Sequence, residues 1–360
     1  MNFKIRKLRN TYLVCFFIIL VFILTACFSP KDNRAANEIK PITKTNFLMG
    51  TLVKITVYGD VDDTVFSKSF ERIREIEDKM TINKDTNKSE IIKLNNSSGK
   101  DFIELSTDTD FVLTKGKYYS EISHGKFDIT IGPIVKLWNI DTENAMIPDK
   151  EIIKEKLSLV DFTNLELDKS GKKAKLKDEG MMVDLGAIAK GYAADEVAKI
   201  LKNAGVKHAI INLGGNILTI GKRPDNSDWR LGLQDPYQPR NEYMAIVKLN
   251  NQSLVSSGTY EKYFEVNGKK YHHIIDPQTG YPAENGLISV SIITSNSIDA
   301  DALSTCIFLL GLEQGMNLVE TLTDVEAIFV TDDKKVYVSS GINQDNFELI
   351  NMNYQLQNQW

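Results

Sequence analysis

The chain has 360 residues, of which 42% are hydrophobic, and it carries a formal net charge of −5 at pH 7. A chain of this size and composition can bury a hydrophobic core that needs no disulfide or structural metal. Its charges are mixed in sign along the sequence, and no basic patch with interleaved aromatic residues occurs. This pattern argues against a nucleic-acid partner.

The N-terminus predicts a lipoprotein signal. Basic residues lie between positions 4 and 9, and an uncharged apolar run extends from Tyr12 to Leu24. This run is short for a membrane span but typical of a secretory signal. Cys27 directly follows Leu24-Thr25-Ala26, which is the pattern that lipoprotein processing recognises. We therefore expect a lipid on Cys27; the alternative is an uncleaved N-terminal anchor, and both place the rest of the chain outside the cytoplasmic membrane.

The cysteines agree with this interpretation. Of the three in the chain, Cys15 would leave with the signal and Cys27 would carry lipid, so Cys306 stands alone. No intramolecular disulfide can then form in the mature protein. A polar segment follows the signal and predicts a tether between the lipid and a folded body. The expected organisation is a signal over 1–26, a tether over 27–45 and one domain over 46–355.

Hydrophobic patterning predicts the elements of this domain in chain order. A strand is expected over 52–58, and Asp62-Asp63 predict the start of a helix whose apolar stripe runs to Met80. The further expected elements are a helix over 107–123, short strands within 165–184, a helix over 187–204, a strand over 208–213, a hairpin over 260–275, a strand over 287–294, a helix capped by Ser297 that runs to Leu310, and a hairpin at Asp332-Asp333.

Strands outnumber helices in this prediction, and several of the strands are joined by hairpins. Asn267-Gly268, for example, is a typical two-residue hairpin turn. The sequence therefore predicts an α+β fold, a single large domain of mainly antiparallel sheet with packed helices, rather than a doubly wound parallel sheet.

Polar side chains on the helix that begins near Ser297 form the first candidate site. Asp301 and Thr305 are four residues apart, so their oxygens project from one face of the helix. A carboxylate and a hydroxyl are hard oxygen ligands and suit Mg²⁺. Asp299 has a simpler interpretation, because an acidic residue in the first turn complements the helix dipole.

A second candidate lies where a strand ends at Asp184 and a helix begins with Lys190 in its first turn. Free backbone N–H groups and a cation there suit a phosphate. The spacing of a Walker A loop is absent, and a strand-to-helix turn of this kind also occurs in many proteins without a ligand.

Two further stretches carry polar groups of interest. The turn Gly125-Lys126-Phe127-Asp128 presents a charged and an aromatic residue that can contact a ring, although most such turns are only turns. His272 and His273 are neighbours on a predicted strand, so their side chains point to opposite faces and a shared metal is not expected.

Taken together and in this order, five motifs resemble the ApbE family, the FAD:protein FMN transferases. The resemblance covers nearly the whole domain, from about Phe47 to the last hairpin. The motifs are Met49-Gly50-Thr51, Gly125-Lys126-Phe127-Asp128, Asp184-Leu185-Gly186-Ala187-Ile188-Ala189-Lys190-Gly191-Tyr192-Ala193, His273-Ile274-Ile275-Asp276-Pro277-Gln278-Thr279-Gly280 and Asp301-Ala302-Leu303-Ser304-Thr305.

The resemblance implies an extracytoplasmic enzyme that uses FAD as substrate and Mg²⁺ as cofactor. It implies transfer of FMN, through its phosphate, to a threonine or serine hydroxyl of an acceptor flavoprotein, with release of AMP. The acceptor is expected to be membrane-associated, because the lipid on Cys27 holds the enzyme at the membrane.

The same resemblance implies site residues, position by position. The FAD contacts would be Met49, Lys126, Phe127, Asp128, Asp184, Lys190 and Ile275. The metal would be held by Asp301, Thr305 and the backbone carbonyl of Ala187, with Ser304 as a possible extra contact. We hypothesise that His273 accepts the proton of the attacking hydroxyl, because it matches the histidine of the family's motif and a neutral histidine can act as a general base.

The sequence departs from the family's pattern in two places. Residues 80–85 match the corresponding family segment only loosely, so no ligand is assigned there. In the segment 256–260, Thr259 replaces the usual acidic residue, a change that bears on acceptor recognition or on the number of metal ions.

Two other functions fit the same motifs. With water in place of the acceptor, the site would be an FAD pyrophosphatase that yields FMN and AMP. A lipid-anchored protein that only binds flavin is the second alternative, and such a protein would not need Mg²⁺ ligands.

Overall fold

The computed structural model describes residues 40–83, 86–140, 142–168 and 172–357. The predicted signal, Cys27 and most of the predicted tether lie outside these residues. The folded domain begins at Pro41, and the description that follows concerns this domain alone.

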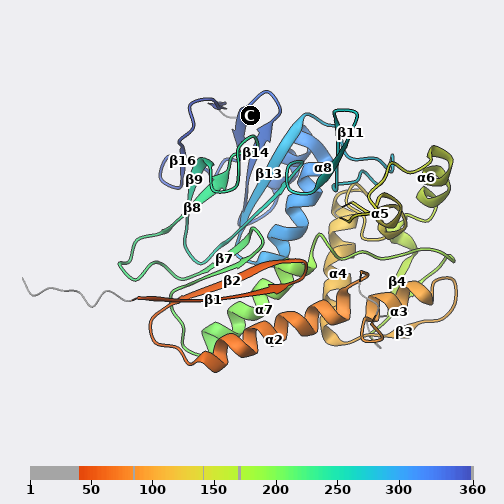
Figure 1. Ribbon diagram of the computed structural model, residues 1–360, viewed down its shortest axis with the longest axis horizontal. Helices are drawn as coiled ribbons and strands as arrows, with labels where there is room; N and C mark the ends of the chain where they lie inside the picture. The colour runs from red at the N-terminus through yellow and green to blue at the C-terminus, as the bar shows by residue number, and fades with distance from the viewer. Residues whose placement is uncertain (1–39, 84–85, 141, 169–171, 358–360) are drawn as a thin grey trace, which may run out of the picture. The chain divides into compact units, whose positions relative to one another are not determined.

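A nine-stranded sheet forms the centre of the domain (Figure 1). Neighbouring strands are antiparallel throughout, except that the last pair is parallel. In spatial order the strands are β1 (Pro41–Leu48), β2 (Thr51–Tyr58), β6 (Ala209–Leu213), β7 (Asn216–Ile220), β10 (Ser253–Gly258), β13 (Leu287–Thr294), β14 (Val325–Thr331), β15 (Lys335–Val338) and β17 (Gln355–Leu356).

Three smaller sheets surround the central one, and each is antiparallel. The first contains β16 (Phe347–Leu349), β9 (Tyr243–Leu249) and β8 (Trp229–Gln234). The second contains β3 (Ile103–Glu104), β5 (Lys173–Leu176) and β4 (Leu165–Asp168). The third is the hairpin of β11 (Tyr263–Val266) and β12 (Lys269–His272).

Helices pack on the central sheet and on one another (Figure 1). α7 packs on β6 and β7, α8 packs on β10, β13 and β14, and α2 covers the outer side of α7. The helices of the described residues are α2 (Asp63–Met80), α3 (Glu90–Asn96), α4 (Thr107–Ile122), α5 (Gly132–Trp138), α6 (Lys150–Leu157), α7 (Ala189–Asn203) and α8 (Ser297–Thr321), with a 3₁₀ turn at Phe162–Asn164.

The predicted fold class is confirmed, since antiparallel strands and packed helices make up the domain. On β2, Val53, Ile55 and Val57 are buried on one face as expected. The carboxylate of Asp62 accepts the Thr64 N–H and caps α2. The hairpins at Asn267-Gly268 and Asp332-Asp333 are also present.

The predicted boundary between tether and domain at residue 46 is wrong, because β1 already begins at Pro41. This strand lies at the edge of the sheet and pairs only with β2. The strand carries polar residues such as Thr43 and Thr45 at exposed positions. In the sequence, polar residues of this kind resemble those of a tether. An edge strand of this kind gives little hydrophobic signal.

The predicted helix at Ser297 needs two corrections. Ser297 is the first helical residue, and no side chain at the preceding Asn296 caps the helix. The helix also continues past Leu310 to Thr321, but Gly311 interrupts it with a φ of 78°. Gly311, which in the sequence suggested that the helix ends at Leu310, therefore marks a kink within a longer helix. α8 is long and apolar enough to cross a membrane by composition, but most of that stretch is buried in the domain, as in a core helix.

The N-terminal halves of α7 and α8 touch through their backbones. A Cβ atom added to Gly191 would lie 2.2 Å from the carbonyl oxygen of Ser297. Only glycine therefore permits this approach, and Gly191 also donates its N–H to the Asp301 carboxylate at 2.9 Å.

We predict that Gly191→Ala lowers the free energy of unfolding by about 1–3 kcal/mol, because the added methyl meets backbone atoms that cannot rotate away. Urea unfolding of the variant and the parent protein measures this change. Lys202→Ala, on an exposed position of the same helix, serves as control and should change stability by less than about 0.5 kcal/mol. Equal stability of Gly191→Ala and the parent would contradict the close contact.

Candidate active site

The predicted metal ligands Asp301 and Thr305 lie one turn apart on α8. Asp301 is buried, with 3% of its surface exposed. Its Oδ2 accepts the Gly191 N–H, whereas its Oδ1 lies 3.6 Å from the Lys190 ammonium group. The Thr305 hydroxyl lies 3.1 Å from the hydroxyl of Ser257 on β10. The structure thus brings Asp301, Thr305 and Lys190 together from two helices.

Asp184 and Lys190 flank the turn that leads into α7. Asp184 accepts the Gly186 N–H at 2.7 Å, and Lys190 donates to the Gly186 carbonyl at 3.2 Å. Burial raises the pKa of Asp184, and the Gly186 N–H and the positive charges of Lys136, Lys190 and Lys262 oppose this rise. Three lysines from separate parts of the chain therefore act on one carboxylate.

The segment that carries Lys126, Phe127 and Asp128 runs beside the segment that ends at Asp184. The Asp184 N–H donates to the Ile129 carbonyl at 2.8 Å, and an isolated bridge joins Ile131 to Met182. The second and third sequence motifs are thus neighbours in space, although more than 50 residues separate them in the chain.

The three residues of this segment have different surroundings. Lys126 pairs with Asp276 at 3.4 Å, so it joins the segment to the loop that follows His273. Phe127 and Asp128 are buried. The Asp128 carboxylate accepts bonds from the N–H and hydroxyl of Thr130 and from the N–H of Phe162. Its oxygens are thus engaged within the protein, and contact with FAD stays a prediction.

The two neighbouring histidines have different surroundings. His272 is buried; its Nδ1 accepts the Ile274 N–H, and its Nε2 bonds the Ala283 carbonyl. His273 lies just after β12 and is exposed, and its Nδ1 bonds the Lys262 carbonyl at 3.2 Å. If Nδ1 carries the proton in that bond, Nε2 is left as an acceptor.

His273 is neutral at pH 7. Although part of the residue is open to solvent, desolvation by the protein around it is the main cause that lowers its pKa, to about 4. The positive charges of Lys262 and Lys190 act in the same direction. A neutral imidazole with a free acceptor nitrogen has the properties of a general base.

The remaining predicted residues lie in different settings. Ile275 is buried against Ile134, Trp138 and Ile153, so its side chain supports the loop. Ala187 lies in the turn before α7 and is half-buried. Met49 occupies the β1–β2 turn with a φ of 52° and packs partly on the core.

The sheet register places the Met49 turn at the same end of the sheet as Ser257. Val53 pairs with Leu213, so the β1–β2 turn lies beside the glycine turn between β6 and β7. Leu254 pairs with Ile217, which directs the end of β10 to that same edge. Met49 and the predicted metal ligand Thr305, which bonds Ser257, thus lie toward the same edge of the sheet.

Several residues of this site were not assigned from the sequence. Lys136 donates to the Ile82 carbonyl and to the Asn83 side chain, and so holds the segment that matched the family only loosely. Ser257 bonds both Ser304 and Thr305. Neither Lys136 nor Ser257 belongs to a motif with a recognisable spacing, so their place in the site becomes visible only in the fold. For Ser257, the one signal in the sequence was that residues 256–260 resemble a segment of the family.

The donor chemistry fits Mg²⁺. The part of the chain that the structure describes has no group of three His, Cys, Asp or Glu side chains that could hold a metal. Asp301 and Thr305 offer a carboxylate and a hydroxyl, and the Ala187 carbonyl can add a third oxygen. Mg²⁺ takes such oxygens and completes its shell with substrate phosphates and water.

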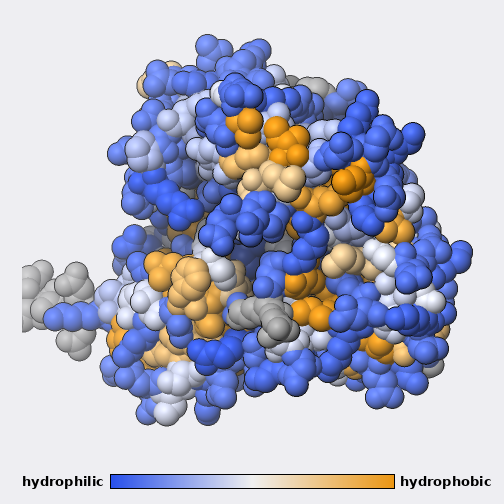
Figure 2. All heavy atoms as spheres, turned by 45° about the vertical axis from the view of Figure 1, so that its right-hand side comes forward, coloured by the Kyte–Doolittle hydropathy of each residue, from blue (hydrophilic) through white to orange (hydrophobic). Residues whose placement is uncertain are grey.

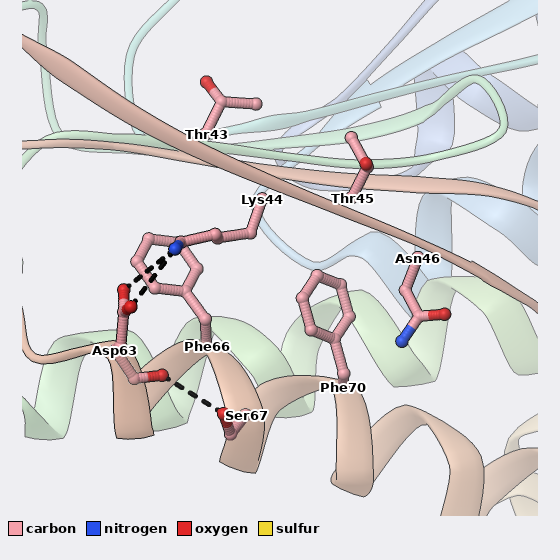
Figure 3. Close-up of a pocket in the computed structure, with 8 residues that line it drawn as sticks. All are labelled: Thr43, Lys44, Thr45, Asn46, Asp63, Phe66, Ser67 and Phe70. Atoms are coloured by element: carbon pink, nitrogen blue, oxygen red, sulfur yellow. Dashed lines mark hydrogen bonds and ion pairs between the residues drawn. The ribbon is translucent and has the colours of Figure 1, made fainter.

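The surface offers more than one recess. Figure 2 shows one face hollowed near its middle, with hydrophobic side chains on either side of the hollow. A cavity of about 390 Å³ lies elsewhere, between β1 and α2, where Phe66 and Phe70 line it and Lys44 pairs with Asp63 (Figure 3). This cavity contains none of the predicted site residues, and its one lysine is already neutralised, so we do not assign the phosphate chemistry to it.

Comparison with known proteins identifies the family. The family model described as the ApbE family matches residues 49–329. A relative from Klebsiella pneumoniae, an FAD:protein FMN transferase, is 37% identical over 81% of this chain and 90% of its own length. A second, from Treponema pallidum and with the same description, is 32% identical over 85% of this chain and 88% of its own.

Solved structures are similar as well. The ApbE protein of Thermotoga maritima has a TM-score of 0.77 and 28% identity, and the match covers 84% of this chain and 98% of that one. The flavin transferase ApbE of Vibrio cholerae has a TM-score of 0.74 and 25% identity, with 84% and 97% covered. The sequence matches, the shared fold and the order of the motifs together establish that this chain belongs to the ApbE family.

Proposed function

We propose that this protein transfers FMN from FAD to a threonine or serine hydroxyl of an acceptor flavoprotein, with Mg²⁺ as cofactor. The observation that carries the proposal is the cluster at the start of α7 and α8. There a buried carboxylate with one oxygen free of hydrogen bonds within the described residues, Asp301, lies beside Thr305 and the cation Lys190. Family membership and the relatives' descriptions support the same reaction.

The reaction forms one phosphoester bond and breaks one bond of the FAD diphosphate. The acceptor oxygen attacks the phosphorus on the FMN side, the bridging oxygen leaves with AMP, and the hydroxyl proton must be removed. Negative charge grows on the leaving phosphate during this step. Lys190 and the two other lysines around Asp184 supply positive charge where such a diphosphate would lie.

Asp301, Thr305 and the carbonyl of Ala187 would hold the Mg²⁺ ion. When bound, Mg²⁺ supplies charge neutralisation for the diphosphate oxygens and helps to orient them. The protein contributes the fixed positions of these ligands, which follow from the contact between α7 and α8. Met49, Lys126, Phe127, Asp128 and Ile275 are proposed to form the rest of the FAD site.

His273 is proposed as the residue that accepts the proton of the acceptor hydroxyl. His273 is exposed as a residue, so a hydroxyl on another protein can approach it. Its lowered pKa keeps it unprotonated throughout the neutral range. The same exposure admits water, which is why hydrolysis of FAD to FMN and AMP is the second candidate activity.

The location of the enzyme is also a proposal. A lipid on Cys27 would hold the domain at the extracytoplasmic face of the membrane. The domain would lie close to the membrane, because the fold begins at Pro41, only a short segment after Cys27. A membrane-associated acceptor would then lie within reach of the active site.

We predict that Asp301→Ala lowers the rate of acceptor flavinylation by at least about 100-fold, since loss of even a group that supports a metal ligand costs about 10–100-fold. The measurement is acceptor-bound flavin fluorescence after denaturation, together with AMP release. Asp299→Asn is the matched control: its carboxylate lies in the same helix but bonds Lys115 and Tyr119.

AMP release that needs no acceptor would favour hydrolysis. If the parent protein binds FAD without any turnover, the protein is a flavin-binding lipoprotein.

The proposed base predicts a pH profile. Because only the neutral form of His273 accepts a proton, transfer should stay constant from pH 8 to about 5 and fall as the pH drops through about 4. His273→Ala should lower transfer at pH 7 by about 10²–10⁴-fold and remove this acid limb. Circular dichroism at each pH shows that the fold is intact. Full transfer by His273→Ala at neutral pH would exclude the assignment.

A further inference from the structure

The first turn of α8 has no cap of its own. Asn296 occupies the N-cap position, but its side chain bonds Asp299 instead of the free backbone N–H groups of the helix. A buried helix start needs acceptors for these groups. Asp195 of α7 provides them, because its two carboxylate oxygens accept the N–H groups of Ser297 at 2.8 Å and Ile298 at 2.9 Å.

The reverse interaction also exists. Asp301 on α8 accepts the N–H of Gly191 on α7 at 2.9 Å. Each helix therefore gives a carboxylate to backbone N–H groups of the other helix. We refer to these contacts, made by Gly191, Asp195, Ser297, Ile298 and Asp301, as the reciprocal cap.

The spacing of the reciprocal cap fixes the register of the two helices. Gly191 and Asp195 are four residues apart on α7, as Ser297 and Asp301 are on α8, so each pair lies on one helix face. Asp195 meets the start of α8, and Gly191 meets Asp301 one turn further along. The two helices are therefore held together by both carboxylates where their first turns meet, and Gly191 packs against Ser297 and Ile298 at the same place.

The proposed metal ligands continue the same two rows. Thr305 is four residues beyond Asp301 on α8, and Ala187 is four residues before Gly191 in the turn that leads into α7. We propose that Asp195 is a positioning residue that sets the register of α7 against α8, and so fixes the distance between the Ala187 carbonyl and the Asp301 and Thr305 oxygens. This inference rests on the proposed function, because it assumes that these oxygens hold the metal.

Mg²⁺ demands nearly ideal octahedral geometry, so a shift between two ligand-bearing segments weakens its binding. The Asp195 carboxylate bonds Ser297 and Ile298, neither of which is a proposed ligand, so its removal should affect metal affinity through the register of the two helices. A purely stabilising cap would instead change the unfolding temperature and leave metal affinity unaltered.

The test uses the full chain and Mn²⁺ alone as probe, with free Mn²⁺ measured by electron paramagnetic resonance at a temperature far below unfolding. Asp195→Asn is expected to weaken Mn²⁺ binding about 10-fold. It should raise the Mg²⁺ concentration for half-maximal AMP release by a similar factor, with kcat at saturating Mg²⁺ largely retained. Asp195→Glu keeps the charge but moves the carboxylate, so it should weaken Mn²⁺ binding too. If Asp195→Asn does not fold, the Mn²⁺ affinity of Asp195→Glu tests the positioning role instead.

Asp299→Asn again provides the control, since it removes one negative charge from the same turn of α8, and the hydrogen bonds of that carboxylate are with Lys115, Tyr119 and Asn296 rather than with α7. It should leave Mn²⁺ affinity within about two-fold of the parent value. Unchanged Mn²⁺ affinity in folded Asp195→Asn, or equal weakening in Asp299→Asn, would overturn the positioning role. Absence of Mn²⁺ binding by the parent protein is a separate result, because it would remove the proposed metal site itself and the inference with it.

Discussion

Two helices that approach each other through a single glycine govern the arrangement of this domain. Gly191 allows the backbone of α7 to reach the Ser297 carbonyl on α8, and any side chain there would collide with it. Each helix then accepts N–H groups of the other through a carboxylate, Asp195 or Asp301. Because both helices lie on the central sheet, the contact couples the core of the fold to the residues proposed to bind metal.

The loops of the candidate site depend on this framework. The turn at Asp184 precedes α7 directly, and a backbone bond to Ile129 joins it to the segment that carries Lys126. Lys126 in turn pairs with Asp276, in the loop after His273. Contacts thus join three separate segments, one to the next, around one cationic region. Charge of this kind suits a diphosphate, whereas the hydrophobic groups beneath it, such as Ile275 and Trp138, hold the loops in place.

The sequence allowed the fold class and the elements with strong periodicity to be predicted, and it placed several candidate site residues that the fold brings together. Val53, Ile55 and Val57 show why, because a half-buried strand leaves a period of two. β1 escaped detection because an edge strand with exposed threonines resembles a tether. The capping of α8 escaped too, since Asp195 lies about 100 residues before the helix that it caps, and no local pattern records such a partner. Lys136 and Ser257 belong to the same class: their roles depend on tertiary contacts alone.

The central claim is that α7 and α8 together present one metal site to the FAD diphosphate. The most direct measurement is the position of Mn²⁺, located by its anomalous scattering in crystals of the protein grown with FAD. The account predicts a single strong peak bounded by the Asp301 carboxylate, the Thr305 hydroxyl and the Ala187 carbonyl, with diphosphate oxygens completing the shell. A Mn²⁺ ion bound elsewhere, with these three oxygens free of metal, would contradict it.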